Sequence, residues 1–283
     1  MPHSRRQIDA EIRAALREIQ SLENATVKDA LQMLSRLRER VVLAIAEAGP
    51  FTQVVAQEVK NRVATIIQEF DSNLKDKMTE NQRRMFTRGI KLVDRAVDAA
   101  DLIKAVPYLD ETALKTAQAF TADLITNLTD DMRGKITSQI QLGVLGQKSA
   151  TDIIKEVGRN LAGPSVFGTI RRRSEIIVRT EVNRVQALAT EARLKQLKAR
   201  VPDLKQEWLH SGLGQPPRQN HVDMNGVQVA IGEKFHLRAK EGDKVYLITG
   251  PYDPTLPVGE TVNCRCVAIP VVGRFEKKSS ENT

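Results

Sequence analysis

Aromatic residues and cysteine are scarce in this sequence. Aromatic side chains make up only 4% of the 283 residues, with a single tryptophan, and there are two cysteines. Aliphatic side chains must therefore provide most of the core packing. Two cysteines cannot form the disulfide framework of a small secreted domain, and a bond between Cys264 and Cys266 would be strained, because only one residue separates them. We expect both thiols to be reduced or to bind something.

Long hydrophobic runs are also lacking. No window approaches the roughly 20 apolar residues that a membrane-spanning helix needs. The first residues lead into a polar amphipathic segment, without the apolar stretch of an export signal. We therefore expect synthesis in the cytoplasm and no membrane partner. The chain also has no heptad run of coiled-coil length and no internal repeat.

Positive charge is distributed unevenly. The formal net charge is +8, yet residues 201–283 contain ten Lys/Arg and ten Asp/Glu. Residues 155–200 contain eleven Lys/Arg and only four Asp/Glu. A basic helical segment of this kind favours a polyanionic neighbour such as nucleic acid. A solvated helix surface is the simpler interpretation of any single charge run.

Apolar residues recur at helical spacing through the first two hundred residues. The predicted helices cover residues 8–22, 31–45, 55–97, 113–124, 132–140, 153–157 and about 168–199. Their candidate N-caps are Asp110, Thr129, and Ser149 or Thr151. Each helix has a single apolar stripe, so the helices must pack on one another or on another subunit.

The pattern changes after residue 200, where glycine and proline become dense. Four short runs have β propensity, over residues 206–209, 227–231, 244–248 and 261–269. On the last of these, Val262, Cys264 and Cys266 would share one face of the strand. The sequence therefore predicts an α+β fold, in which an elongated helical N-terminal region is followed by a small β-rich C-terminal module packed on the long helix.

An ordered set of residues runs from the long helix to the paired thiols. Its members are Arg179-Thr180-Glu181, Trp208, Arg218, His221, Asn225-Gly226, Phe235, the Pro251–Pro254 segment with Asp253, and Asn263-Cys264-Arg265-Cys266. In order and approximate spacing this set resembles the phage head morphogenesis domain of the Mu F-like minor head proteins. The resemblance covers about residues 130–272.

The resemblance implies a virion protein of a tailed bacteriophage or prophage, made in the host cytoplasm. Such minor capsid proteins are present in few copies inside the head, near the portal, and act in head assembly and in DNA packaging or ejection. The implied partners are the portal protein, the major capsid protein and packaged double-stranded DNA. The implied role is structural, and we expect no enzymatic activity.

With this resemblance, the chain divides into four consecutive parts. We expect a helical region over residues 1–128, the helical part of the head morphogenesis domain over 129–200 and the β-rich module over 201–273. Residues 274–283 are polar, and we expect them to form a flexible tail.

His221, Cys264 and Cys266 are candidate metal ligands, because zinc binds imidazole and thiolates, and His210 or His236 could complete a tetrahedron. Against this, two cysteines one residue apart on a strand would be spread awkwardly for one ion. The alternative is a β core in which both cysteines are small buried apolar groups and His221 bonds to the backbone or to an acid. We prefer this alternative and expect no cofactor, with zinc as the competing hypothesis.

Arg218, His221 and Asp223 could bind phosphate or perform acid–base chemistry, as in a nuclease or a toxin-like hydrolase. A nuclease would need a second catalytic group, and none is identifiable in the sequence. Arg218 is more simply a loop anchor, paired with a carboxylate such as Asp253.

Arg171, Arg172 and Arg173 could contact packaged DNA or an acidic surface of a neighbouring subunit. Positive charge near the start of a helix opposes the helix dipole, and an anionic partner would relieve that conflict. The same residues would serve a DNA-binding accessory protein, which is a further alternative.

The other members of the ordered set have structural interpretations. A salt bridge from Arg179 or Glu181 could fix the long helix against the β module. Asn225-Gly226 suits a type I′ hairpin turn, and the segment around Asp253 suits a rigid turn. We expect Trp208 and Phe235 to be core residues.

Overall fold

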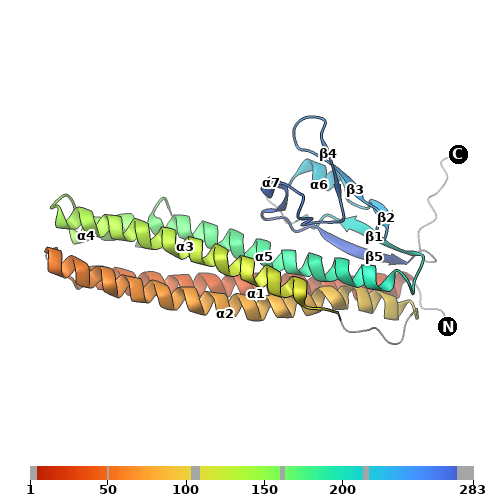
Figure 1. The fold of residues 1–283 in the computed structure, drawn as a ribbon, viewed down its shortest axis with the longest axis horizontal. Coiled ribbons are helices and arrows are strands. Elements are labelled where there is room, and N and C mark those ends of the chain that lie inside the picture. Colours follow the sequence, from red (N-terminus) through yellow and green to blue (C-terminus); the bar gives the residue numbers. More distant parts are fainter. Residues whose placement is uncertain (1–4, 50, 103–108, 160–162, 213–216, 273–283) are drawn as a thin grey trace. The chain divides into compact units, whose positions relative to one another are not determined.

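The computed structural model describes residues 5–49, 51–102, 109–159, 163–212 and 217–272. Before the first β-strand, the described residues form the helices α1 (Arg5–Ala46), α2 (Gln53–Ala99), α3 (Thr112–Val144), α4 (Ala150–Val157) and α5 (Val166–Leu197). Five short strands follow from residue 204 onward. The predicted α+β class, with helices first and a small β-rich module last, is confirmed (Figure 1).

The helices are fewer and longer than the sequence pattern predicts. The segments 8–22 and 31–45 belong to one helix, α1, and the segments 113–124 and 132–140 belong to one helix, α3. Thr129 therefore lies inside α3 and is not an N-cap. Its hydroxyl group bonds to the Ile125 carbonyl, one turn back, and to the Asp71 carboxylate on α2.

Two other predicted caps are confirmed. The side chain of Asp110 accepts hydrogen bonds from the backbone N–H and the hydroxyl group of Thr112, the first residue of α3. Ser149 caps α4 in a reciprocal arrangement with Asp152, in which each side chain bonds to the backbone N–H of the other residue.

The contacts divide the chain into two compact units. Unit 1 contains residues 1–23, 82–116 and 180–283, and unit 2 contains residues 24–81 and 117–179. Both units combine segments that are far apart in the sequence, and α1, α2, α3 and α5 contribute residues to each. The division into consecutive parts stays a prediction, and the tail over 274–283 lies outside the described residues.

The β module of unit 1 contains two small antiparallel sheets (Figure 1). In the first, β1 (Leu204–Leu209) lies between β2 (Gln228–Ala230) and β5 (Val267–Val272), in the order β2-β1-β5. In the second, β3 (Phe235–Arg238) pairs with β4 (Val245–Ile248). Two short helices, α6 (Gln219–Asp223) and α7 (Val258–Thr261), lie in the connections.

The β module has its own buried core. The members of this cluster are Trp208, Met224, Phe235, Leu237, Ile248, Tyr252, Leu256, Cys264 and Cys266. Trp208 and Phe235 are both fully buried, so their prediction as core residues is confirmed. Ala187 of α5 packs against the same cluster, which places the module on the long helix.

Two local predictions in the module are wrong. The last strand begins at Val267, because residues 258–261 form α7 and Asn263 adopts a left-handed conformation with φ 55°. Asn225-Gly226 is not a two-residue hairpin turn, because α6 lies between the paired strands β1 and β2. Gly226 alone of these two residues has positive φ, at 84°, and its N–H donates to the Trp208 carbonyl.

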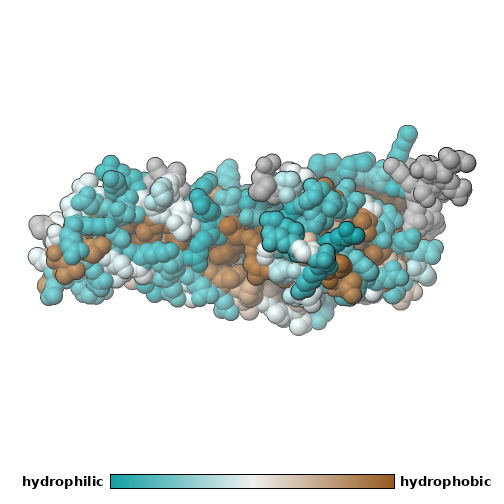
Figure 2. Space-filling view, turned by 90° about the horizontal axis from the view of Figure 1, so that it is seen from above, coloured by the Kyte–Doolittle hydropathy of each residue, from teal (hydrophilic) through white to brown (hydrophobic). Residues whose placement is uncertain are grey.

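The face drawn in Figure 2 is largely polar. Figure 2 shows one face on which hydrophilic residues predominate and hydrophobic side chains form separate patches. Within the described ranges, no helix combines the length and the apolar character that crossing a membrane requires.

Gly89→Ala is expected to lower the free energy of unfolding by about 1–3 kcal/mol. Gly89 lies on α2 against α5, and a Cβ atom there would lie 2.6 Å from the Gln186 carbonyl oxygen and 2.8 Å from Ala189 Cβ. These atoms belong to a helix and cannot move cheaply. Urea unfolding followed by circular dichroism measures the effect.

Gly134→Ala is the matched control, because Gly134 is exposed within α3 and a Cβ atom there would meet nothing within 4 Å. It should raise stability by up to about 1 kcal/mol, through helix propensity. Equal effects of the two substitutions would contradict the assigned helix contact.

Candidate functional site

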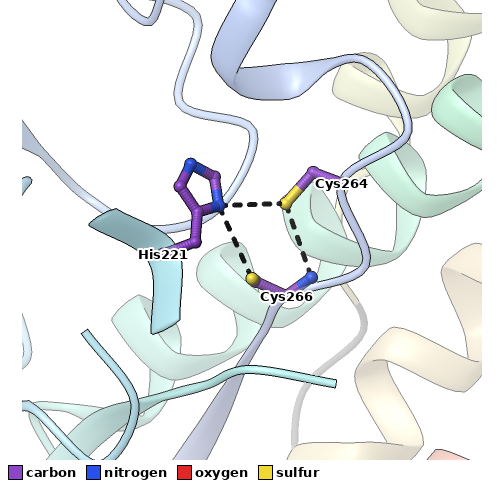
Figure 3. Close-up of side chains that lie close together, drawn as sticks. All are labelled: His221, Cys264 and Cys266. Atoms are coloured by element: carbon purple, nitrogen blue, oxygen red, sulfur yellow. Dashed lines mark hydrogen bonds between the residues drawn. The ribbon is translucent and has the colours of Figure 1, made fainter. Parts of the chain in front are cut away.

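Three side chains of the β module point toward one another and form what we call the thiol–imidazole cluster: His221, Cys264 and Cys266 (Figure 3). His221 comes from α6, and the two cysteines come from the turn between α7 and β5. The Nδ1 atom of His221 lies 3.6 Å from Cys264 Sγ and 3.6 Å from Cys266 Sγ. All three residues are buried, with exposures of 2–4%.

The turn geometry brings the two thiols together. Asn263 takes the left-handed conformation, which asparagine tolerates better than most residues. The backbone N–H of Cys264 then donates to the Thr261 carbonyl, and that of Cys266 donates to Cys264 Sγ at 3.4 Å. The cysteines are therefore not spread along a strand. The argument that their spacing is too wide for one metal ion is wrong.

A buried carboxylate fixes the imidazole ring. Glu260 Oε2 lies 2.9 Å from His221 Nε2, and Glu260 is itself 7% exposed. A carboxylate accepts hydrogen bonds, so this contact places a proton on Nε2, and Nδ1 is the ring atom that faces the sulfurs. Asn220 holds Glu260 through a further hydrogen bond. Sequence reasoning anticipated an acid beside His221 without identifying Glu260, because an isolated glutamate carries no motif.

The pKa values of the two thiols shift in opposite directions. The hydrogen bond from Cys266 lowers the pKa of Cys264 well below its usual value, although burial opposes this shift. The same bond and burial raise the pKa of Cys266.

Trp208 covers one side of the thiol–imidazole cluster. Its ring lies edge-on to the His221 ring, with 5.4 Å between centroids, and edge-on to Phe235 at 5.7 Å. The indole Nε1–H is buried and has no hydrogen-bond partner among the described residues. It lies beside the Cys266 thiol and offsets part of the rise in the pKa of that thiol.

The thiol–imidazole cluster lines a cleft within unit 1 with a volume of about 810 Å³. Arg218 also lines it, but its guanidinium donates to the Val262 carbonyl at 2.5 Å. The prediction that Arg218 pairs with Asp253 is therefore wrong. Asp223 is exposed and accepts a hydrogen bond from Gln219.

The two other histidines considered as metal ligands lie apart from the cluster. His236 is exposed, on the face of β3 opposite to the buried Phe235. His210 lines the cleft, and its Nδ1 atom accepts from the Gly212 N–H. Among the described residues, the ligand atoms that gather within 4.8 Å belong to His221, Cys264 and Cys266.

The turn that carries the thiols is tied to two helices of unit 1. Arg265 forms a 2.7 Å ion pair with Glu23 of α1, and Asn183 of α5 donates to the same carboxylate. The Asn263 N–H donates to the hydroxyl oxygen of Thr180 on α5. Glu23 is 3% exposed, and no pattern in the sequence indicates that this residue meets the cysteine motif.

Within the Arg179-Thr180-Glu181 motif, Thr180 makes the described contact to the turn that carries the thiols. Arg179 pairs with Glu175 and Glu181 pairs with Arg184, and all four residues lie on α5. Burial raises the pKa of Glu181, and Arg184 opposes this shift.

Asp253 organises the loop between β4 and α7. Its carboxylate accepts hydrogen bonds from the backbone N–H and the hydroxyl groups of Thr249 and Thr255. Burial alone would raise the pKa of Asp253, but these four hydrogen bonds outweigh burial and lower it. The predicted rigid turn is therefore held by a charged side chain as well as by proline.

Asp253→Asn is expected to lower the free energy of unfolding by about 2 kcal/mol near neutral pH. The folded-state pKa lies below the unfolded value, so this stabilisation is complete above the unfolded pKa and is lost as pH falls through the folded pKa. The difference between wild type and variant should therefore shrink below about pH 4. Urea unfolding of both proteins at neutral pH and below about pH 4 measures this difference in the free energy of unfolding. Asp243→Asn, at an exposed position of the same module, should change little.

The arginine triplet lies on the part of α5 that belongs to unit 2. Arg171 and Arg172 are exposed, and Arg173 forms an ion pair with Asp131 of α3. Because α5 begins at Val166, the triplet lies beyond the first turn, where the helix dipole acts weakly. The expected conflict with the dipole is therefore small.

Comparisons with known proteins give one partial similarity. No family model matches the chain, and no solved structure matches it. A segment of 69 residues is 38% identical to part of a Bacillus subtilis (strain 168) protein described as uncharacterized protein YqbB. The similarity covers 24% of this chain and 21% of that protein, so the chain spans about a fifth of the length of this relative.

Proposed function

We propose that this chain is a structural minor head protein of a tailed bacteriophage. It acts inside the head near the portal, in assembly and in DNA packaging or delivery, and it binds the portal protein or the major capsid protein. The observation that carries the proposal is that residues scattered along the ordered set meet in one buried core: Trp208, His221, Phe235, Cys264 and Cys266.

The chemistry of these residues favours holding a shape over turnover. His221 is bonded to Glu260, and Arg218 is bonded to a backbone carbonyl, so the two candidate catalytic residues already have structural partners. Both thiols are buried. A module whose polar groups are engaged in this way suits a protein that keeps a fixed position among larger partners.

The location of the chain in purified particles tests the proposal. Particles of the phage or prophage that encodes the chain should contain it in low copy number, protected from protease until the heads are opened. Deleting its gene should yield heads that are defective in DNA content or delivery. Its absence from both immature and mature heads would overturn the proposal. Genes for portal and terminase beside its own gene would support it.

Exposed arginines on α5 support contact with packaged DNA. Replacing Arg171 and Arg172 with glutamate should weaken retention of double-stranded DNA and reduce the salt dependence of binding. If each arginine neutralises one phosphate, the slope of log affinity against log salt should fall by about 2. Retention of DNA on the full chain across a salt series measures both effects.

Replacing Arg13 and Arg17 with glutamate is the matched control. These exposed arginines lie on α1 in unit 1, and the substitutions change the net charge by the same amount. If this control weakens binding equally, the affinity reflects net charge rather than α5. If the wild-type chain shows no salt-dependent retention, direct contact with DNA is ruled out.

A further inference from the structure

We propose that His221, Cys264 and Cys266 bind one zinc ion, through Nδ1 and the two Sγ atoms. The proposal concerns the β module itself and does not depend on the role of the protein in a phage head. It replaces the expectation that the cysteines act only as small apolar core residues.

The distances from Nδ1 to the two sulfurs fit one tetrahedral ion, and the three atoms lie within 4.8 Å of one another. Zinc lies about 2.3 Å from thiolate sulfur and about 2.0–2.1 Å from imidazole nitrogen, so tetrahedral angles place a ligand nitrogen and sulfur about 3.5–3.6 Å apart. In the structure, Nδ1 lies 3.6 Å from each sulfur. The turn at Asn263 produces this match, because it brings both sulfurs to the same ring nitrogen.

Protein hydrogen bonding alone does not account for this arrangement. The Nδ1 atom can make one well-aligned hydrogen bond in the ring plane, as donor or as acceptor. Two sulfurs lie at equal distances from it, so at most one thiol can be well paired with it. A cation at that point would satisfy both sulfurs and the nitrogen together.

The groups around the ligands are those that a zinc site needs. Glu260 bonds to the far nitrogen of His221, as carboxylates do behind zinc-bound histidines, where they fix the ring and raise its basicity. The Cys266 N–H donates to Cys264 Sγ and stabilises negative charge on that sulfur. The buried Nε1–H of Trp208, whose ring lies edge-on to His221, is a further donor and has no hydrogen-bond partner among the described residues.

The donor set selects the ion. Thiolates and imidazole together favour zinc among the common divalent ions, whereas magnesium and calcium prefer oxygen ligands. Cysteine binds zinc as thiolate, so any thiol proton is released to solvent on binding. Three protein ligands leave a fourth position, and the cleft that the cluster lines gives a water molecule access to it.

Metal analysis of the full chain tests the proposal. Protein expressed with added zinc and purified under reducing conditions should contain about one zinc ion per chain. Cys264→Ser with Cys266→Ser should bring the content close to zero, and Glu260→Gln should weaken affinity about 10–100-fold. His236→Ala is the matched control, because this exposed histidine lies in the same module, and it should leave the content unchanged.

A titration of the wild-type chain guards against variants that do not fold. Metal-free protein should take up one equivalent of Co²⁺, with a sulfur-to-metal charge-transfer band and a change in Trp208 fluorescence, and zinc should displace it. Chelation should also lower the melting temperature. A folded metal-free chain that takes up neither ion would overturn the proposal. Full metal content in the double cysteine variant would overturn the assignment of these ligands.

Discussion

Trp208→Ala is expected to lower the free energy of unfolding of unit 1 by about 3–5 kcal/mol. The indole is fully buried and lies edge-on to the rings of His221 and Phe235. Its removal leaves a cavity beside the thiol–imidazole cluster, which the short strands around it cannot refill. Because Trp208 is the single tryptophan, urea unfolding of the variant must be followed by circular dichroism.

Leu247→Ala is the control for this prediction. Leu247 is also a large hydrophobic residue of the β module, on β4, but it is 57% exposed. Its replacement should change stability by less than about 0.5 kcal/mol. Similar losses in the two variants would show that Trp208 does not hold the core of the module.

Glu23→Ala should destabilise unit 1 by a similar amount, about 3–5 kcal/mol. The carboxylate is 3% exposed, and it accepts from Arg265 at 2.7 Å and from Asn183 at 3.1 Å. Its removal leaves the Arg265 guanidinium, which is mostly buried, without this countercharge. Chemical unfolding at moderate salt measures the loss, because a buried pair is screened weakly.

Glu18→Ala is a close control, since Glu18 lies on the same helix and also pairs with two arginines, Arg88 and Arg95. Its side chain is 40% exposed, so the substitution should cost less than about 1 kcal/mol. If Glu23 and Glu18 gave equal losses, burial would not be what makes the Glu23 contact strong.

The sequence predicts which segments are helical, but not where the helices join. The apolar pattern lapses after Leu22, and this lapse predicts a break that α1 does not have. Glu23 and Thr26 occupy the interval, and both are buried polar residues. Hydrophobic periodicity counts only apolar residues. It therefore does not detect a buried polar side chain, which partners distant in the sequence stabilise. Thr129, inside α3, fails as a predicted cap for the same reason.

The candidate site was half predictable. Cysteine and histidine are informative residue types, so the three members of the thiol–imidazole cluster stand out in the sequence. Their geometry does not, because alternation of residues 262–268 resembles a strand, and the left-handed Asn263 that reverses the chain carries only a weak signal. Glu260 and Glu23 carry no motif, and their roles come entirely from tertiary contacts.

The phage family, the location in the virion and the portal, capsid and DNA partners stay predictions. They rest on the order of residues between Arg179 and Cys266, and the partial similarity to the Bacillus subtilis protein does not bear on them. Particle composition and DNA retention are the measurements that bear on them directly.

The ion pair between Arg265 and Glu23 joins residues 242 positions apart. During synthesis, Glu23 is made 242 residues before Arg265, so the ion pair cannot form until that intervening chain has been synthesised. Contacts that close such long loops form slowly, because they demand the loss of much chain entropy. We therefore expect the thiol-bearing turn to dock on α1 late in folding, after both segments of unit 1 have been synthesised.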